Sequence, residues 1–215
     1  MQACQFQYVF LGIETPDEQV LVQTQKKINT VKPLIERVRR IYAAGISVTA
    51  GFIIGFDSEP EHPEETIINF IQDSGIMLAM IGLLSALPNT QLTRRLGRER
   101  RLISSDHQWI DEPVTRYDLI SETGHDQTCG GLNFVTVRDR VEIYSQLKTI
   151  IEAVYSPQAF MDRVLDTTER IKLRSRHLPN GWEWKRMLRG WLVLSGRLLA
   201  NRKTRALYLR NAWKS

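Results

Sequence analysis

The sequence predicts an α/β fold in which a parallel β-sheet is followed by an all-helical tail. Three continuous apolar runs, rich in strand-forming residues, indicate the sheet: Tyr8–Ile13, Ser47–Phe56 and Met77–Leu84. Segments with helical spacing separate these runs, and buried strands that alternate with helices form parallel sheets covered by helices on their faces. The tail is marked by its charge, because residues 170–215 hold 13 Lys/Arg and the single acid Glu183.

Each apolar run is followed by a segment that we expect to be helical. Thr15 is a suitable N-cap for the first helix, with Pro16 at its first position, and Gly45 and Gly75 are expected to end the next two. The stretch 101–135 is polar and irregular, and such a long unpatterned segment is usually functional or disordered. The expected helices are 17–27, 31–44, 64–74, 91–100, 138–155 and 157–174, followed by a basic amphipathic helical region to the end of the chain.

Composition excludes several classes of protein. The hydrophobic share of 42% and the charged share of 25% are those of a globular protein. No apolar run reaches the roughly 18 residues of a membrane span, so we expect no transmembrane helix, and the first residues of the sequence do not indicate secretion. Cys4 and Cys129 form no CxxC pair, which argues against a disulfide scaffold and against a complete metal site. We expect a cytoplasmic protein.

The ends of the predicted strands carry residues suited to ligand binding, which is where parallel sheets bind ligands. Glu14 can accept hydrogen bonds from a ribose hydroxyl or an ammonium group, and Gly51 and Gly55 leave room for a flat ligand against the strand backbone. Structural explanations stay open. Glycines also allow close helix packing, an acid near a helix N-terminus complements the helix dipole, and Pro88-Asn89-Thr90 is a common turn-and-cap sequence.

Taken together, these segments resemble strands four, five and six of the radical S-adenosylmethionine (SAM) barrel, a partial TIM barrel. The segments are Phe10-Leu-Gly-Ile-Glu-Thr-Pro16, Ala50-Gly-Phe-Ile-Ile-Gly-Phe-Asp57 and Leu84-Ser-Ala-Leu-Pro-Asn-Thr90. Further on, Leu132–Val135 and Ile151–Phe160 resemble the C-terminal DUF4070 region of the subgroup that binds cobalamin. The resemblance implies the C-terminal half of the barrel at 1–100, a loop-rich connection at 101–135 and a helical region with a basic tail at 136–215.

The resemblance also implies a chemistry. The family binds SAM on a [4Fe–4S] cluster and modifies a carbon centre by a radical reaction, in some members a methylation. Glu14 matches the strand-four position near the SAM ribose and methionine, and Gly51, Ile53 and Gly55 match the strand that backs the adenine. The cofactor-binding residues that follow from the resemblance are Glu14, Thr15, Gly51, Ile53, Gly55, Asp57, Pro88 and Thr90. We predict no catalytic side chain and no metal ligand.

The sequence departs from the family pattern in several places. The family holds its cluster with a C-x-x-x-C-x-x-C loop after strand one, whereas this chain begins just before strand four and lacks the cobalamin domain. Asn89 replaces the glycine of the usual Pro-Gly-Thr, and Ser58, flanked by Asp57 and Glu59, replaces an acid. We therefore expect a truncated gene product, one part of a split gene or a fragment of a longer protein, inactive alone. The free edge of the first strand is expected to be covered by the missing N-terminal half, which a separate gene could encode, or by another chain.

Other functions stay open on the residues alone. One is a non-catalytic interaction module that keeps the half-barrel as a scaffold, and another is a different α/β enzyme with Glu14 and Asp57 as paired carboxylates. The substrate is expected to be a small molecule or a lipid. For the basic tail, a helix packed on the barrel is the simplest explanation, docking to anionic lipid is the next, and nucleic acid is an unlikely partner. Cys129 and the scattered histidines fit no zinc pattern.

Overall fold

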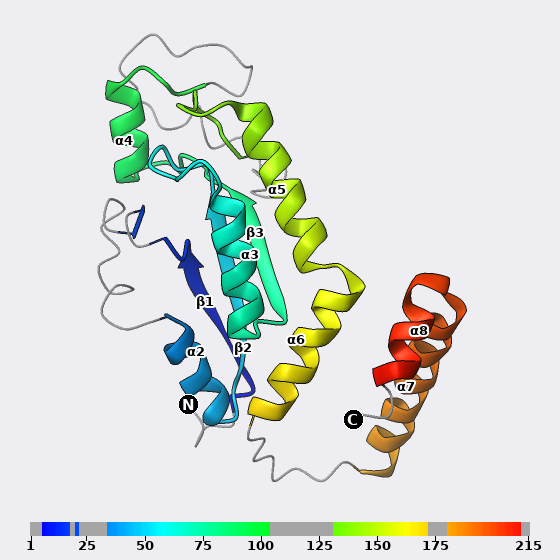
Figure 1. Ribbon diagram of the computed structural model, residues 1–215. Coiled ribbons are helices and arrows are strands. Elements are labelled where there is room, and N and C mark those ends of the chain that lie inside the picture. Colours follow the sequence, from blue (N-terminus) through cyan, green and yellow to red (C-terminus); the bar gives the residue numbers. More distant parts are fainter. Residues whose placement is uncertain (1–5, 18–19, 22–33, 104–130, 172–179, 212–215) are drawn as a thin grey trace.

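The computed structural model describes residues 6–17, 20–21, 34–103, 131–171 and 180–211. Within them, β1 (Tyr8–Glu14), β2 (Ser47–Ile54) and β3 (Leu78–Leu83) form a parallel sheet in the order β1-β2-β3 (Figure 1). The helices are α2 (Leu34–Ala43), α3 (Pro63–Ser74), α4 (Gln91–Arg98), α5 (Arg140–Val154), α6 (Pro157–Arg170), α7 (Gly181–Ala200) and α8 (Arg202–Asn211). The predicted alternation of strands and helices is confirmed over 34–98.

The element boundaries follow local backbone preferences. Gly45 and Gly75 adopt φ values of 77° and 73° after α2 and α3, in the left-handed region that glycine enters without steric cost. The predicted helix at 17–27 lies outside the described residues except at its start. There, the Thr15 hydroxyl accepts the Asp17 N–H at 3.2 Å, and the Asp17 carboxylate accepts the Val20 N–H at 3.0 Å. Two side chains, those of Thr15 and Asp17, therefore accept backbone N–H groups at this helix start, whereas the sequence predicted only Thr15 as a cap.

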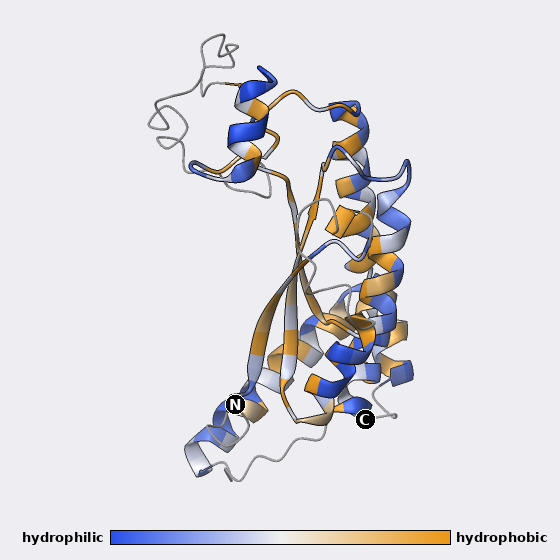
Figure 2. Ribbon diagram, turned by 90° about the vertical axis from the view of Figure 1, so that its left-hand side faces the viewer, coloured by the Kyte–Doolittle hydropathy of each residue, from blue (hydrophilic) through white to orange (hydrophobic). Residues whose placement is uncertain are grey.

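The described helices cover one face of the sheet and leave the other face open (Figure 2). In β2, alternate side chains from Val48 to Ile54 are buried against the helices, and those between them are half-buried on the opposite face. The expectation of a sheet covered on both faces is therefore wrong for the residues that the structure describes. The open face is nevertheless apolar, which is why the strands read as fully buried: Tyr8, Phe10, Leu78 and Met80 are all more than half exposed there.

The helical layer is tied together at the C-terminus of α3. The Tyr42 hydroxyl of α2 donates to the Gly75 carbonyl at 3.1 Å, and the buried Thr167 hydroxyl of α6 donates to the same oxygen. Burial raises the pKa of Tyr42 to about 12, so this phenol stays a proton donor over the whole physiological range. Three helices far apart in sequence thus share one carbonyl group.

The two edges of the sheet differ. At β3, the Tyr155 hydroxyl accepts the Ala79 N–H at 3.1 Å and donates to the Ala79 carbonyl at 2.6 Å, so one side chain satisfies the backbone groups that a further strand would use. At β1, none of the described residues pairs with the outer edge. A groove of about 470 Å³ runs there between Val9 and Leu11 of the strand and Arg37, Arg40 and Ile41 of α2.

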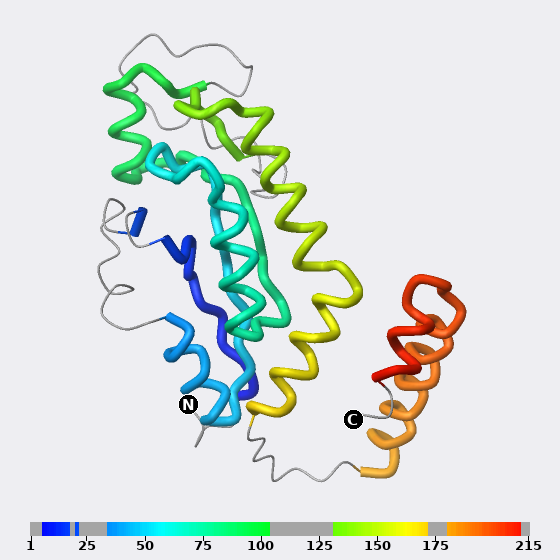
Figure 3. Tube along the Cα trace, in the orientation of Figure 1, coloured from blue at the N-terminus to red at the C-terminus, as the bar shows by residue number. Residues whose placement is uncertain are grey.

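The tail forms an antiparallel hairpin of α7 and α8 that stands beside α6 (Figure 3). Asn180 and Glu183 form a capping box at the start of α7, and the hydroxyls of Ser195 and Tyr208 join the two helices at 2.6 Å. Arg210 of α8 donates to Gln158 of α6 at 2.7 Å. Over the described residues, no helix has both the length and the apolarity needed to cross a membrane.

Candidate functional site

At the carboxyl end of β1, the backbone takes a special conformation that aims Glu14 at the open face. The register with β2 shifts between Gly12 and Glu14, and Glu14 has φ 67°, which is rare for a residue other than glycine. Glu14 Oε1 would lie 2.9 Å from a Cβ atom placed on Gly12, so the carboxylate reaches back over this glycine. Backbone strain of this kind is often found at functional sites. The prediction that Glu14 lies at the sheet's ligand-binding end is consistent with this geometry.

The next strand continues the same surface. Gly51 is the register partner of Gly12, and both lie on the open face. The Phe10 ring overlies Gly51, since its Cζ atom would lie 2.9 Å from an added Cβ. Ile53 follows two residues later on this face and is half-buried. The structure thus places Glu14, Gly51 and Ile53 on one face of the sheet, where the Glu14 carboxylate lies over Gly12 and the Phe10 ring lies over Gly51.

The loop after β2 is organised by a buried carboxylate. Gly55 has φ 104°, and its N–H donates to both carboxylate oxygens of Glu59 at 2.9 and 3.0 Å. The Glu59 side chain is 1% exposed, and Arg138 donates to it at 2.9 Å. Burial raises the pKa of Glu59 to about 7, although the Gly55 and Phe56 N–H groups and Arg138 act in the opposite direction. Gly55 therefore fixes the loop, because no side chain fits its backbone conformation without strain.

Asp57 is held by two arginines. Its Oδ1 accepts from Arg101 Nη2 at 2.7 Å, while its Oδ2 accepts from Arg101 Nη1 at 2.9 Å and from Arg95 at 2.7 Å. The hydrogen bonds from Arg101 hold the pKa of Asp57 below its usual range, so the carboxylate stays ionised. A permanently paired carboxylate is a poor proton donor, which argues against the alternative of Glu14 and Asp57 as catalytic partners. That Asp57 also contacts a cofactor stays a prediction.

The turn after β3 explains the departure at Asn89. Its φ is 64°, in the left-handed region where asparagine is the best tolerated residue after glycine, so Asn89 can replace the family glycine. Thr90 caps α4, because its hydroxyl accepts the Thr93 N–H at 3.2 Å and donates to the Leu87 carbonyl at 2.9 Å. Pro88 is half-buried before the turn. Asn89 and Thr90 thus shape the turn and cap the helix, and contact of Pro88 or Thr90 with a cofactor stays a prediction.

A segment from the C-terminal part of the chain lies against the ends of the strands. The Leu132 N–H donates to the Leu84 carbonyl at 2.7 Å, and the Asn133 side chain accepts from the Ala86 N–H at 2.7 Å and donates to the Ala86 carbonyl at 3.1 Å. Leu102 and Phe134 form an antiparallel bridge. Residues 131–135 therefore hold the loop after β3 in place.

The described residues fit SAM better than they fit an iron–sulfur cluster. Gly12 and Gly51, the glycine floor, have no side chains, and the Glu14 carboxylate and the Phe10 ring lie over them. A carboxylate next to an aromatic ring suits the charged methionine and the flat adenosine of SAM. An iron–sulfur cluster needs several thiolates. Among the residues described, no group of three His, Cys, Asp or Glu is placed to hold a metal ion, and Cys4 and Cys129 lie outside them.

Sequence reasoning missed several residues of this region. Phe10 and Met80 were given no role of their own and were placed only within apolar segments of the sequence, yet both side chains are exposed on the open face. The buried pair of Glu59 and Arg138 joins positions 79 residues apart, and no local pattern indicates such a contact. For Phe10, the period-two alternation of β1 could have shown that it shares a face with Gly12.

Comparison with known proteins gives two kinds of match. A family model described as "Domain of unknown function (DUF4070)" matches residues 90–215, from the cap of α4 to the end of the chain. An uncharacterized methyltransferase of Synechocystis sp. is 35% identical over 163 residues, which make up 76% of this chain and 27% of that protein. A hopanoid C-2 methylase of Rhodopseudomonas palustris is 42% identical over 108 residues, which make up 50% of this chain and 20% of that protein. The chain thus spans less than a third of the length of either relative.

Proposed function

Since this chain belongs to the family defined by the DUF4070 domain, as the resemblance of Leu132–Val135 and Ile151–Phe160 predicted, we propose that it forms part of a radical SAM enzyme that methylates a carbon centre. Both relatives carry names of methyl-transferring proteins, which supports this reaction class. In this proposal, the sheet β1–β3 is the C-terminal half of the catalytic barrel, and its open face is the barrel interior. The cluster and cobalamin would be bound by parts of the enzyme other than the residues described.

The observation that carries the proposal is the glycine floor beside Glu14. In a parallel sheet, ligands bind at the carboxyl ends of the strands, which is where Gly12, Gly51 and Glu14 meet. When bound, SAM on an iron–sulfur cluster would supply the radical and methyl chemistry. The residues of this chain would hold it: the Phe10 ring would turn aside so that Gly51 and Ile53 support the adenine, and Glu14 would accept hydrogen bonds from the ribose or the ammonium group.

The substrate class follows from the rest of the open face. The open face is apolar up to the glycine floor, because it exposes Tyr8, Phe10, Leu78 and Met80. A largely apolar substrate would bind there favourably, since binding removes apolar surface from water. The name of one relative, a hopanoid methylase, supports a lipid of that type. We therefore propose a hydrophobic, lipid-like substrate rather than a charged one.

Binding of SAM to the purified chain tests the proposal. Saturation-transfer NMR is expected to show contact of the adenine protons with the chain. Gly51→Val is expected to abolish that signal, because its side chain would displace the Phe10 ring and fill the floor. Gly97→Ala is the matched control, since its added methyl meets only Leu102 at an ordinary 3.6 Å. Equal saturation transfer in Gly51→Val and the parent chain would contradict this site, and the scaffold without a SAM pocket would then be the better description.

A further inference from the structure

Helix α7 exposes an apolar surface that none of the described residues covers. Seven of its large apolar side chains are each more than half exposed: Trp182, Trp184, Met187, Leu188, Trp191, Leu192 and Leu194. Only Ser195 is buried, where α8 packs against α7 through Tyr208. Exposed apolar surface on this scale marks a site of interaction with another molecule.

The exposed side chains of α7 separate into two faces. At 100° per residue, Trp184, Leu188 and Trp191 follow one another at spacings of four and three on one side of the helix. Arg186, Arg189 and Arg197 fall on the other side by the same geometry. Trp182 lies with these cations, because the Arg186 guanidinium stacks over its ring at 4.9 Å. Ser195, which α8 covers, falls on the aromatic side by the same geometry, so α8 covers the C-terminal part of this side. The part from Trp184 to Leu192 stays open, with the arginines on the opposite side of the helix.

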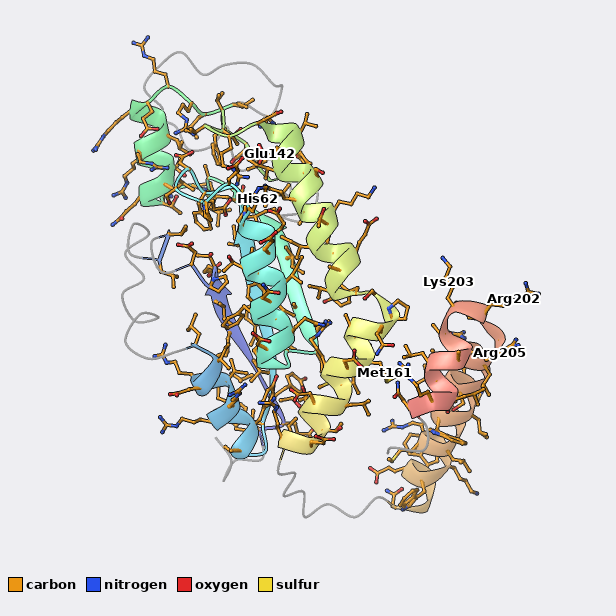
Figure 4. All side chains as sticks on the ribbon, in the orientation of Figure 1. His62, Glu142, Met161, Arg202, Lys203 and Arg205 are labelled. Carbon is orange, nitrogen blue, oxygen red and sulfur yellow. The ribbon has the colours of Figure 1, made fainter. Side chains whose placement is uncertain are left out.

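The charge of the hairpin is one-sided. Residues 180–211 contain eight Lys/Arg and one acid, and that acid, Glu183, is already bonded to the Asn180 N–H at 2.8 Å. Arg202 and Lys203 project from the turn between α7 and α8, away from the body of the protein (Figure 4), while Arg205 donates to the Leu199 carbonyl at 2.7 Å. Such a surface attracts a polyanionic partner.

We propose that the α7–α8 hairpin docks on the surface of a membrane that contains anionic lipid, with α7 lying in the plane of the interface. The apolar face would enter the boundary between headgroups and acyl chains, where Trp and Leu side chains are favoured, and the arginines and lysines would meet lipid phosphates. A nucleic acid would satisfy the cations but leave Met187, Leu188 and Leu192 in water. An acidic protein could bind both the cations and the apolar side chains. However, the cores of protein–protein interfaces are depleted in charged residues, so this surface fits such a partner less well. This inference does not depend on the proposed methyl transfer.

Vesicle sedimentation with the full chain tests the docking. The probes are vesicles of phosphatidylcholine alone and vesicles that contain phosphatidylglycerol as a major component. We expect binding to the anionic vesicles that weakens with added salt, and much weaker binding to neutral ones. The double substitution R186E/R189E is expected to weaken binding roughly tenfold or more. K148E/R98E makes the same change in net charge at exposed positions of α5 and α4 and should leave binding unchanged.

A second pair of variants tests the apolar face. L188S/L192S is expected to lower binding at high salt as well as at low salt, because it removes buried hydrocarbon rather than charge. V137S/V141S is its control, since both valines are highly exposed outside the hairpin. Circular dichroism of each variant checks that the helices persist. Failure to bind anionic vesicles, equal loss in the control variants, or tighter binding to duplex DNA than to vesicles would each overturn the proposal.

Discussion

The buried carboxylate of Glu59 leads to a pH dependence that can be isolated. Its side chain is 1% exposed and lies between the Gly55 N–H and Arg138, at the junction of the β2 loop and the C-terminal region. Burial raises its pKa from 4.5 to about 7 in the folded chain. The folded state therefore binds a proton at this site more tightly than the unfolded state does.

The sign of the effect follows from proton binding. Between pH 4.5 and pH 7, the folded chain holds more protons at Glu59 than the unfolded chain, so its contribution to stability is largest below pH 4.5 and is lost as the pH rises through 7. A tenfold difference in proton affinity between the two states corresponds to about 1.4 kcal/mol, so the free energy of unfolding is expected to fall by about 3 kcal/mol over this window through Glu59.

Urea unfolding of the parent chain and of Glu59→Gln at several pH values between 5 and 8 measures this contribution. Other titrating groups are the same in both proteins, so the difference between the two curves isolates Glu59. Arg138→Met is a second comparison. Without its cationic partner, Glu59 should have a still higher pKa, so the free energy of unfolding should start to decline at a higher pH. A difference curve that is flat from pH 5 to 8, or that rises with pH, would refute the reasoning.

Three further substitutions have defined outcomes. Gly131→Ala should destabilise the chain by about 2 kcal/mol, because its Cβ would collide with the Leu83 Cβ and lie 3.0 Å from the Leu83 carbonyl oxygen; urea midpoints equal to those of Gly97→Ala would contradict this. Tyr155→Phe should cost about 2 kcal/mol in thermal unfolding, since it leaves both backbone groups of Ala79 unpaired, and an unchanged melting temperature would speak against that role. Gly190→Ala should stabilise α7 by about 1 kcal/mol, because nothing lies near its added methyl, and should raise the helical signal on heating; a lower signal would indicate a contact on this face.

The sequence was most informative where structure depends on neighbours along the chain. Gly45 and Gly75 ended helices as expected, and three apolar runs became the three strands. These features depend on φ preferences and on burial, which a local pattern records. Whether helices cover one face of the sheet or both could not be predicted in this way. An apolar strand face has the same sequence pattern whether described helices cover it or leave it open.

Contacts between distant positions lay beyond local patterns. Asp57 was predicted as a ligand-binding acid, and the structure shows its carboxylate shared between Arg95 and Arg101, of which the second lies 44 residues away. The charged residues of the long irregular stretch gave no sign of this pairing. Glu14 and Asn89 were recognised through motifs, and the structure gives the physical reason for them. Glu14 at the end of β1 and Asn89 in the turn before α4 both occupy left-handed backbone conformations.

The C-terminal region is part of the strand-end structure rather than an appendage to it. Arg138 binds Glu59 in the loop after β2, Asn133 binds both backbone groups of Ala86 after β3, and Arg101 joins Asp57 to the Val135 carbonyl at 2.7 Å. The two loops that follow the glycine floor are therefore fixed by residues outside the sheet. Because a binding site holds its geometry only as well as its supporting contacts do, we expect the SAM pocket that we propose to depend on the DUF4070 region. Its task in this chain would then be to position those loops, while the α7–α8 hairpin brings them to the membrane that holds an apolar substrate.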